Sequence, residues 1–137
     1  MGLEKGVHLK FAHIAGRGAI CYTPDGRHII TCGEDTLVKV FDADELGAEP
    51  RTFENHEASV TALAIDRKGA RFVTGTDAHI AQVFNFPSGE GQRILTRMQS
   101  AIRSVAFDPK GKLVAVGADD GAIRLTMVSA VGSQFVS

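Results

Sequence analysis

The chain has 137 residues, a length suited to one domain, and 44% of them are hydrophobic, which is enough to supply a core. Its formal net charge of -1 excludes the basic excess that drives binding to phosphate, so the bulk charge does not favour a nucleic-acid ligand. No segment is long and apolar enough to span a membrane, and the first residues lack the apolar core of a signal peptide, so we expect an intracellular protein.

The chain opens with a lead-in, residues 1–12, in which residues 7–11 alternate between apolar and polar as a half-buried strand does. A first unit, residues 13–55, follows. Pro24 presets φ for a turn and Gly26 supplies a positive φ, so a hairpin is expected between its first two strands. The strands predicted in this unit are 19–22, 29–32, 37–41 and 51–53.

A second unit, residues 56–97, repeats this order. In a third unit, residues 98–127, the first strand begins at about Ile102 and the repeat pattern is lost toward the end. Residues 128–137 form an irregular tail with a weak strand at 134–136. No helix is expected, because β-branched and aromatic residues dominate the periodic runs and glycine interrupts them. The strands predicted in the second unit are 60–65, 72–75, 80–84 and 92–97, and residues 105–107 lead into the first turn of the third unit.

The two cysteines, Cys21 and Cys32, lie in apolar runs rather than at the spacing of a metal or redox motif. Two interpretations are open, a disulfide between them or two buried free thiols in a reducing compartment. The pattern favours the free thiols.

The three units are copies of one another. Residues 25–42, 68–85 and 110–127 align without a gap, and Gly26, Gly69 and Gly111 lie 43 and 42 residues apart. A period of about 40 to 45 residues with paired β runs is typical of a propeller blade. The sequence therefore predicts an all-β fold built from three blades.

The repeats resemble WD40 repeats, in which Gly-His is followed about 22 residues later by an Asp and then by Trp-Asp. In the first repeat His13 and Asp35 are 22 residues apart, and Phe41 stands where the Trp would be. The resemblance implies a buried network in which the histidine bonds a hydroxyl and a carboxylate. The expected network residues are His13, Thr31, Asp35, Phe41, His56, Thr74 and Asp120.

The second and third copies of this network are incomplete. The second keeps His56 and Thr74 but has Ala78 at the Asp position, while the third has Met98 for the histidine and Thr126 for the tryptophan. A buried imidazole left unpaired costs about 1–3 kcal/mol. We therefore expect the second blade to be the weaker one unless His56 faces water.

A closer resemblance is carried by Phe-Pro-Ser-Gly at 86–89, Ile-Leu-Thr-Arg at 94–97, and the opening residues 9–13. Over about residues 7–126 the chain is similar to the replisome adaptor family called chromosome transmission fidelity factor four, known in animals as the WD-repeat and HMG-box DNA-binding protein. The resemblance implies a nuclear adaptor on chromatin that links the replicative helicase to DNA polymerase alpha. The second propeller and the HMG box of that family lie beyond these repeats. The alternative is a generic WD40 scaffold in an unrelated complex.

Three repeats cannot close a ring, since a seven-bladed propeller of this period needs roughly 300 residues. A partial WD40 propeller is therefore expected, whether as a fragment, a truncated product or one part of an assembly.

An enzyme is not expected. His13, Thr31 and Asp35 could be interpreted as a hydrolase triad, but their spacing is that of the structural network, and no positioned nucleophile accompanies them. No phosphate-binding glycine motif follows a strand. The sequence therefore predicts a non-enzymatic interaction module with no metal, cofactor or small-molecule substrate.

Blade topology separates the charged turns into two sets. The second turns and the histidine-bearing loops share one face, which is acidic: Glu34, Asp35, Glu54, Glu57, Asp77, Asp119 and Asp120. These charges and those of the opposite face could simply be solvated turn residues. The functional alternative is a basic face that meets acidic peptides or, with weaker support, DNA. The candidate interaction surface consists of Arg27, Arg67, Lys68, Arg71, Lys110 and Lys112.

Overall fold

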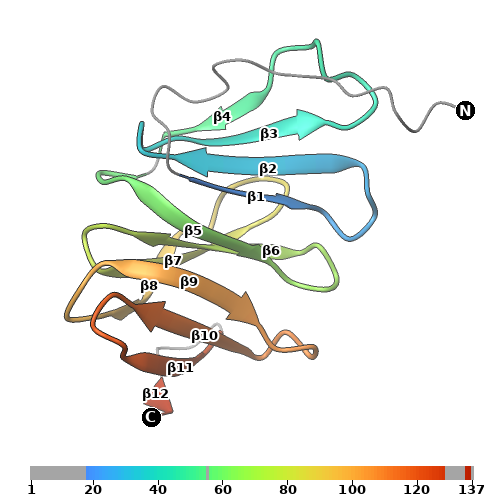
Figure 1. Cartoon of the computed structure of the whole chain (residues 1–137). Coiled ribbons are helices and arrows are strands. Elements are labelled where there is room, and N and C mark those ends of the chain that lie inside the picture. The colour runs from blue at the N-terminus through green and yellow to red at the C-terminus, as the bar shows by residue number, and fades with distance from the viewer. Residues whose placement is uncertain (1–17, 55, 129–134, 137) are drawn as a thin grey trace, which may run out of the picture.

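The computed structural model describes residues 18–54, 56–128 and 135–136, and every regular element among them is a β-strand. The strands form three antiparallel four-stranded sheets, called blades 1, 2 and 3 in chain order (Figure 1). This architecture confirms the predicted all-β partial propeller, in which no ring closes. The strands are β1 (Gly18–Tyr22), β2 (His28–Gly33), β3 (Val38–Asp42) and β4 (Arg51–Phe53) in blade 1; β5 (Val60–Ile65), β6 (Arg71–Thr76), β7 (Ile80–Asn85) and β8 (Arg93–Arg97) in blade 2; and β9 (Ile102–Phe107), β10 (Leu113–Ala118), β11 (Ile123–Met127) and β12 (Phe135–Val136) in blade 3.

The strands expected within the described residues all overlap observed ones. The weak strand expected at 134–136 is β12, which pairs with β11. Two expectations, the strand at 7–11 and the position of His13, lie outside the described residues.

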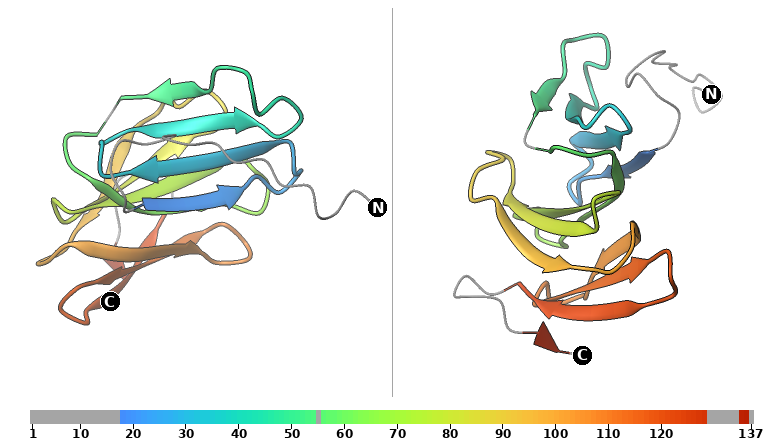
Figure 2. Two further views of the ribbon diagram at one scale, coloured as in Figure 1. Left: turned by 45° about the horizontal axis from the view of Figure 1, so that its top comes forward. Right: turned by 90° about the vertical axis from the view of Figure 1, so that its left-hand side faces the viewer.

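The blades stack face to face, as Figure 2 shows. The first strand of each blade lies beside the first strand of the next, so that β5 contacts both β1 and β9. Each blade therefore has a front face, toward the preceding blade, and a back face, toward the following one. Because side chains alternate along a strand, each face draws on every second residue.

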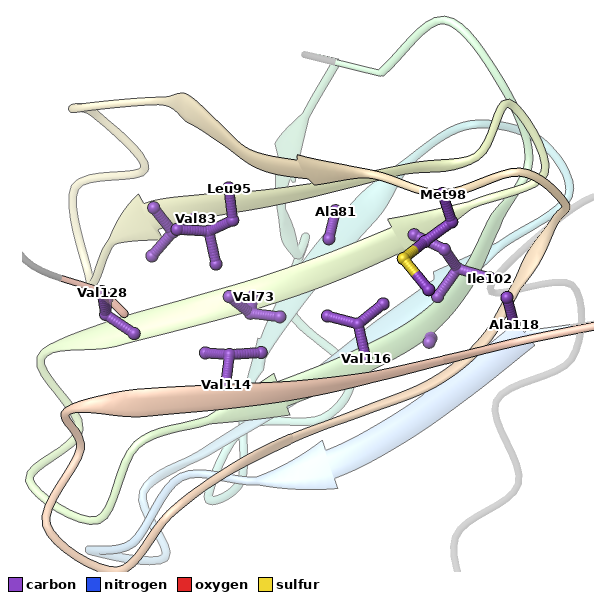
Figure 3. Packing of buried hydrophobic residues seen from close by; sticks show 11 residues of the cluster. Val73, Ala81, Val83, Leu95, Met98, Ile102, Val114, Val116, Ala118 and Val128 are labelled. Carbon is purple, nitrogen blue, oxygen red and sulfur yellow. The ribbon is translucent and has the colours of Figure 1, made fainter. Parts of the chain in front are cut away.

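Large side chains line the front of blade 2 and smaller ones line its back. The front carries Leu63, Ile65, Phe72 and Phe84, and the back carries Ala62, Val73, Ala81 and Val83. Figure 3 shows the back face packed against Val114 and Val116 of blade 3. Burial of these apolar surfaces joins the blades.

An aromatic cluster joins blades 1 and 2. The ring of Phe72 stacks on Phe84 at 4.9 Å between centroids and on Phe53 at 6.0 Å. At the edge of this cluster the Arg51 guanidinium lies over the Phe53 ring and donates hydrogen bonds to the carbonyl oxygens of Pro87 and Ser88, the latter at 2.6 Å. The outer strand of blade 1 is thus tied to the β7–β8 turn of blade 2.

Both cysteines are free thiols, as expected. Cys32 is buried and Cys21 is half-buried. Burial raises the pKa of the Cys21 thiol to about 11 and that of Cys32 to about 12, so both thiols stay protonated at neutral pH.

Candidate interaction surface

The first hairpin turns of the three blades have the same construction. In each, a glycine N–H donates to the carbonyl three residues earlier: Gly26 to Thr23, Gly69 to Asp66, and Gly111 to Asp108, at 2.9 to 3.0 Å. All three glycines have φ near +70°, a conformation that costs other residues energy. The shared geometry places the three turns in a row at one end of the blades, on the right in Figure 1.

The first residue of each turn holds it closed with its side chain. Thr23 Oγ1 accepts a hydrogen bond from the His28 N–H at 3.1 Å. Asp66 Oδ1 accepts a hydrogen bond from the Arg71 N–H, also at 3.1 Å. Asp108 Oδ1 accepts from the N–H groups of Leu113 and Lys112. The bond from Leu113, with those from Lys112 and Lys110, lowers the pKa of the Asp108 carboxyl. These polar groups therefore fix the backbone that carries the neighbouring basic side chains.

A cleft of about 320 Å³ lies between the first turns of blades 2 and 3. Its cationic lining residues are Arg67, Lys68, Arg71 and Lys110, and Asp66 contributes a carboxylate. We call this hollow the basic cleft. Four cations around one carboxylate favour an anionic ligand there.

The residues of the candidate surface do not all contribute to this cleft. Arg67, Lys68 and Lys110 are exposed along it, whereas Arg71 is half-buried and its Nη1 donates to the carbonyl of Val128 at 3.0 Å. Lys112 and Arg27 lie on the third and first turns, outside the lining. Among the candidate residues that line the basic cleft, three are exposed and Arg71 is anchored by its hydrogen bond.

Acidic residues also lie at this end of the molecule, although the sequence pattern predicted an acidic face only at the opposite end. In the β3–β4 connector, the Ala43 N–H donates a hydrogen bond to the Arg27 carbonyl of the first turn at 2.9 Å. The β7–β8 connector is bound to the second turn by the Phe86 N–H and the Ala70 carbonyl. The connectors bring the exposed residues Asp44, Glu45, Glu49 and Glu90 to this end of the blades. Positive charge is therefore concentrated at the basic cleft rather than spread over the face.

In blade 2, two of the residues expected in the network, His56 and Thr74, lie within hydrogen-bond distance. His56 is buried, its Nε2 lies 2.8 Å from Thr74 Oγ1, and its ring packs against Phe84 at 5.2 Å between centroids. Its Nδ1 has no hydrogen-bond partner among the described residues, since Ala78 occupies the acidic position. Burial lowers the pKa of the imidazole to about 4.

The other two blades differ at the equivalent positions. In blade 1, Phe41 is buried and Asp35 Oδ1 accepts from the Leu37 N–H at 3.2 Å. In blade 3, Met98 and Val116 replace both the histidine and the hydroxyl, and both are buried. Replacing both polar partners avoids an unpaired group. Asp120 instead accepts from the Ala122 N–H at 3.0 Å and so closes its own turn.

The opposite end of the blades carries the acidic turns. There Asp119 forms an ion pair with Arg103 at 2.8 Å, with both side chains well exposed. An exposed pair of this kind contributes little to stability. Part of the predicted acidic face is therefore neutralised by a local cation.

Residues 9–42, 47–84 and 90–126 match the family model described as WD domain, G-beta repeat. The three matches cover most of the chain. This chain belongs to the WD40 repeat family. WD40 domains generally mediate protein–protein interaction and are non-catalytic scaffolds.

Several curated proteins are similar to this WD40 chain. It is 28% identical over 121 residues to WD repeat and HMG-box DNA-binding protein 1 of Mus musculus, covering 88% of this chain and 10% of the relative. It is 27% identical over 118 residues to Minichromosome loss protein 1 of Schizosaccharomyces pombe, covering 85% and 14%. With THO complex subunit 3 of Arabidopsis thaliana the identity is 29% over 110 residues, covering 80% and 34%. The chain thus spans about a tenth of the length of the first of these relatives.

Two further observations apply to the described part of the WD40 repeats. It contains no helix that is both long and apolar enough to cross a membrane. It also contains no group of three or more His, Cys, Asp or Glu side chains that could hold a metal ion.

Proposed function

We propose that this WD40 chain is the protein-interaction module of a nuclear replisome adaptor, which connects the replicative helicase and DNA polymerase alpha on chromatin. The observation that carries the proposal is the similarity to WD repeat and HMG-box DNA-binding protein 1 across 88% of the chain. The segments at 86–89 and 94–97 add support because WD40 repeats in general do not require them. Minichromosome loss protein 1 is a second relative whose name concerns chromosome maintenance.

The basic cleft is the proposed docking site, and its ligand is an acidic segment of a partner protein. Arg67 and Lys68 from blade 2 face Lys110 from blade 3 across the cleft, so a short anionic segment would contact both blades. The acidic connectors at this end of the blades disfavour a long DNA backbone, which would extend beyond the cleft toward them. Chromatin association would then come through proteins.

The test is recovery of named replisome components by the tagged full chain from nuclear extract, measured by immunoblot for helicase subunits and DNA polymerase alpha. The unmodified chain is expected to recover both. A Lys68→Glu/Lys110→Glu variant should lose them, while Arg97→Glu/Arg103→Glu, which changes the net charge equally at other sites, should keep them. Recovery of neither component by the folded chain would overturn the replisome role, and equal recovery by the cleft variant would overturn the role of the cleft.

A scaffold in an unrelated complex is the second candidate. The 29% identity to THO complex subunit 3, of which this chain covers a larger share than of the other two relatives, favours it. Recovery of a different defined complex in the same experiment, without helicase or polymerase, would support this candidate.

A further inference from the structure

Two arginines of blade 2 converge on one backbone carbonyl that follows the third strand of blade 3. Arg71 Nη1 donates to the Val128 carbonyl oxygen at 3.0 Å, and Arg93 Nη2 donates to the same oxygen at 2.8 Å. Both arginines are half-buried, and Val128 is buried at one end of the core that Figure 3 shows. The two donating nitrogen atoms are therefore within about 6 Å of each other, a separation at which like charges repel.

A hollow of about 220 Å³ lies beside this pair, and we call it the arginine hollow. The Val128 carbonyl is neutral, so it accepts hydrogen bonds from the two guanidinium groups without compensating their charge. The hollow itself is lined by two cations and no acidic residue, so it presents two positioned positive charges to a ligand. The lining residues are Arg71, Val83, Phe84, Asn85, Gly91 and Arg93.

The arginine hollow adjoins the basic cleft. Arg71 lines both of them. Arg93 lines the hollow and not the cleft, while Arg67, Lys68 and Lys110 line the cleft and not the hollow. An anionic segment that lies in the cleft can therefore place one of its side chains in the hollow.

The paired guanidinium groups suit a phosphate better than a carboxylate. A carboxylate carries one charge and two oxygens, which match the fork of a single arginine. A phosphate on a serine or threonine carries a charge of about -1.5 to -2 at neutral pH and three acceptor oxygens, so one phosphate can accept hydrogen bonds from two arginines. It also offsets the repulsion between two cations, which a single negative charge does only in part.

We propose that the arginine hollow binds a phosphorylated serine or threonine of the partner segment, with Arg71 and Arg93 holding the phosphate. The inference rests on the docking role proposed for the basic cleft, and it makes phosphorylation of the partner a regulator of the association. A phosphate of DNA carries one charge and continues into a long backbone, which the acidic connectors at this end disfavour.

The test is fluorescence anisotropy with three labelled peptides of glutamate and glycine. They differ only at the centre, which is serine, phosphoserine, or two glutamates that match the charge of phosphoserine. The phosphoserine peptide is expected to bind about tenfold more tightly than either of the others. Arg93→Lys and Arg71→Lys each keep the charge and lose the fork, so in both variants the preference over the two-glutamate peptide should disappear.

Arg124→Lys is the matched control. Arg124 Nη1 donates to Thr96 Oγ1 at 2.9 Å and to the Arg97 carbonyl at 3.0 Å, so this arginine also joins blade 3 to blade 2. It lines neither the cleft nor the hollow. The control variant should therefore keep the preference for phosphoserine. Far-UV circular dichroism and urea unfolding of all three variants verify that the blades still fold.

The outcomes separate this inference from the role of the basic cleft. Equal binding of the phosphoserine and two-glutamate peptides by the unmodified chain would overturn the inference and leave the cleft in place, whereas binding of no peptide would overturn both. A preference retained in the folded Arg93→Lys variant, or lost equally in Arg124→Lys, would also overturn it. A labelled double-stranded oligonucleotide that binds as tightly as the phosphoserine peptide, and is weakened by Arg93→Lys, would assign the hollow to nucleic acid instead.

Discussion

His56 Nε2 lies 2.8 Å from Thr74 Oγ1, while the other ring nitrogen of this buried histidine has no partner in the described part of the chain. The imidazole is therefore neutral and only half satisfied. This state follows from one residue, Ala78, at the position where the WD40 pattern has an aspartate.

Ala78→Asp is expected to raise the free energy of unfolding by about 1–2 kcal/mol, because the new carboxylate can accept from Nδ1 of His56. Urea denaturation measures the change. In a His56→Leu background the same substitution should bring no gain. A gain of equal size in both backgrounds would mean that the carboxylate acts elsewhere.

Stability should fall in mildly acidic solution because of His56. Its pKa is lowered to about 4 in the folded chain from the ordinary value of 6.5, so the unfolded chain takes up the proton first. The contribution of neutral His56 to the free energy of unfolding is complete above about pH 6.5. It decreases by at most about 3 kcal/mol as the pH falls from there toward 4. Urea titrations across this range should show a steeper fall for the unmodified chain than for His56→Leu. Parallel curves would contradict the assignment.

The carboxyls of Asp25 and Asp108 act in a lower pH range. Hydrogen bonds from the Thr23 hydroxyl and the Arg27 N–H lower the pKa of Asp25. The hydrogen bond from the Leu113 N–H is the largest cause of the lowered pKa of Asp108. These two carboxylates contribute to the free energy of unfolding when the pH is above 3.8, the ordinary pKa of aspartate. The contribution is lost as the pH falls below that value. The two effects are therefore separable from that of His56.

Reversing the charge of the basic cleft should weaken binding to an acidic peptide and flatten its dependence on salt. The change is Lys68→Glu/Lys110→Glu, and fluorescence anisotropy with a labelled polyglutamate peptide measures it. A loss of about tenfold or more is expected, because both cations line the cleft. Adding Lys112→Glu should have a smaller effect, since Lys112 lies outside the lining.

The control for the cleft is Arg97→Glu/Arg103→Glu, which alters the net charge by the same amount. If this variant binds as weakly as the cleft variant, the peptide responds to the overall charge and not to the cleft.

Gly89→Ala should destabilise the chain more than Gly26→Ala. Both glycines have positive φ, near +75° and +71°, so either substitution costs about 1–2 kcal/mol in backbone strain. A Cβ at Gly26 would meet no atom within 4 Å, whereas at Gly89 it would lie 2.4 Å from the Phe53 ring. The clash adds about 1–3 kcal/mol. Thermal or urea unfolding of the two variants should show this difference, and equal losses would show that the ring moves aside freely.

Much of the fold follows from local sequence signals. The period of glycines at 26, 69 and 111 sets the three hairpin turns, and β-branched runs between them set the strands. The same period predicted that the basic first turns lie at one end. These signals suffice because a strand and a tight turn depend on neighbours a few residues away.

Contacts between blades were decided by the tertiary structure alone. Arg71 appeared as a free basic residue in the sequence, but the carbonyl of Val128, 57 residues further along, holds its guanidinium. The acidic residues reach the basic end because the β3–β4 and β7–β8 connectors are hydrogen-bonded to the first hairpin turns there. Whether His56 faced water also depended on the packing of Phe84 over its ring. The sequence by itself determined three blades and their turns, since these arise from short-range pattern. The tertiary structure decided which charged groups are held by distant carbonyl oxygens and which side chains pack between blades, because both depend on what distant segments place against them.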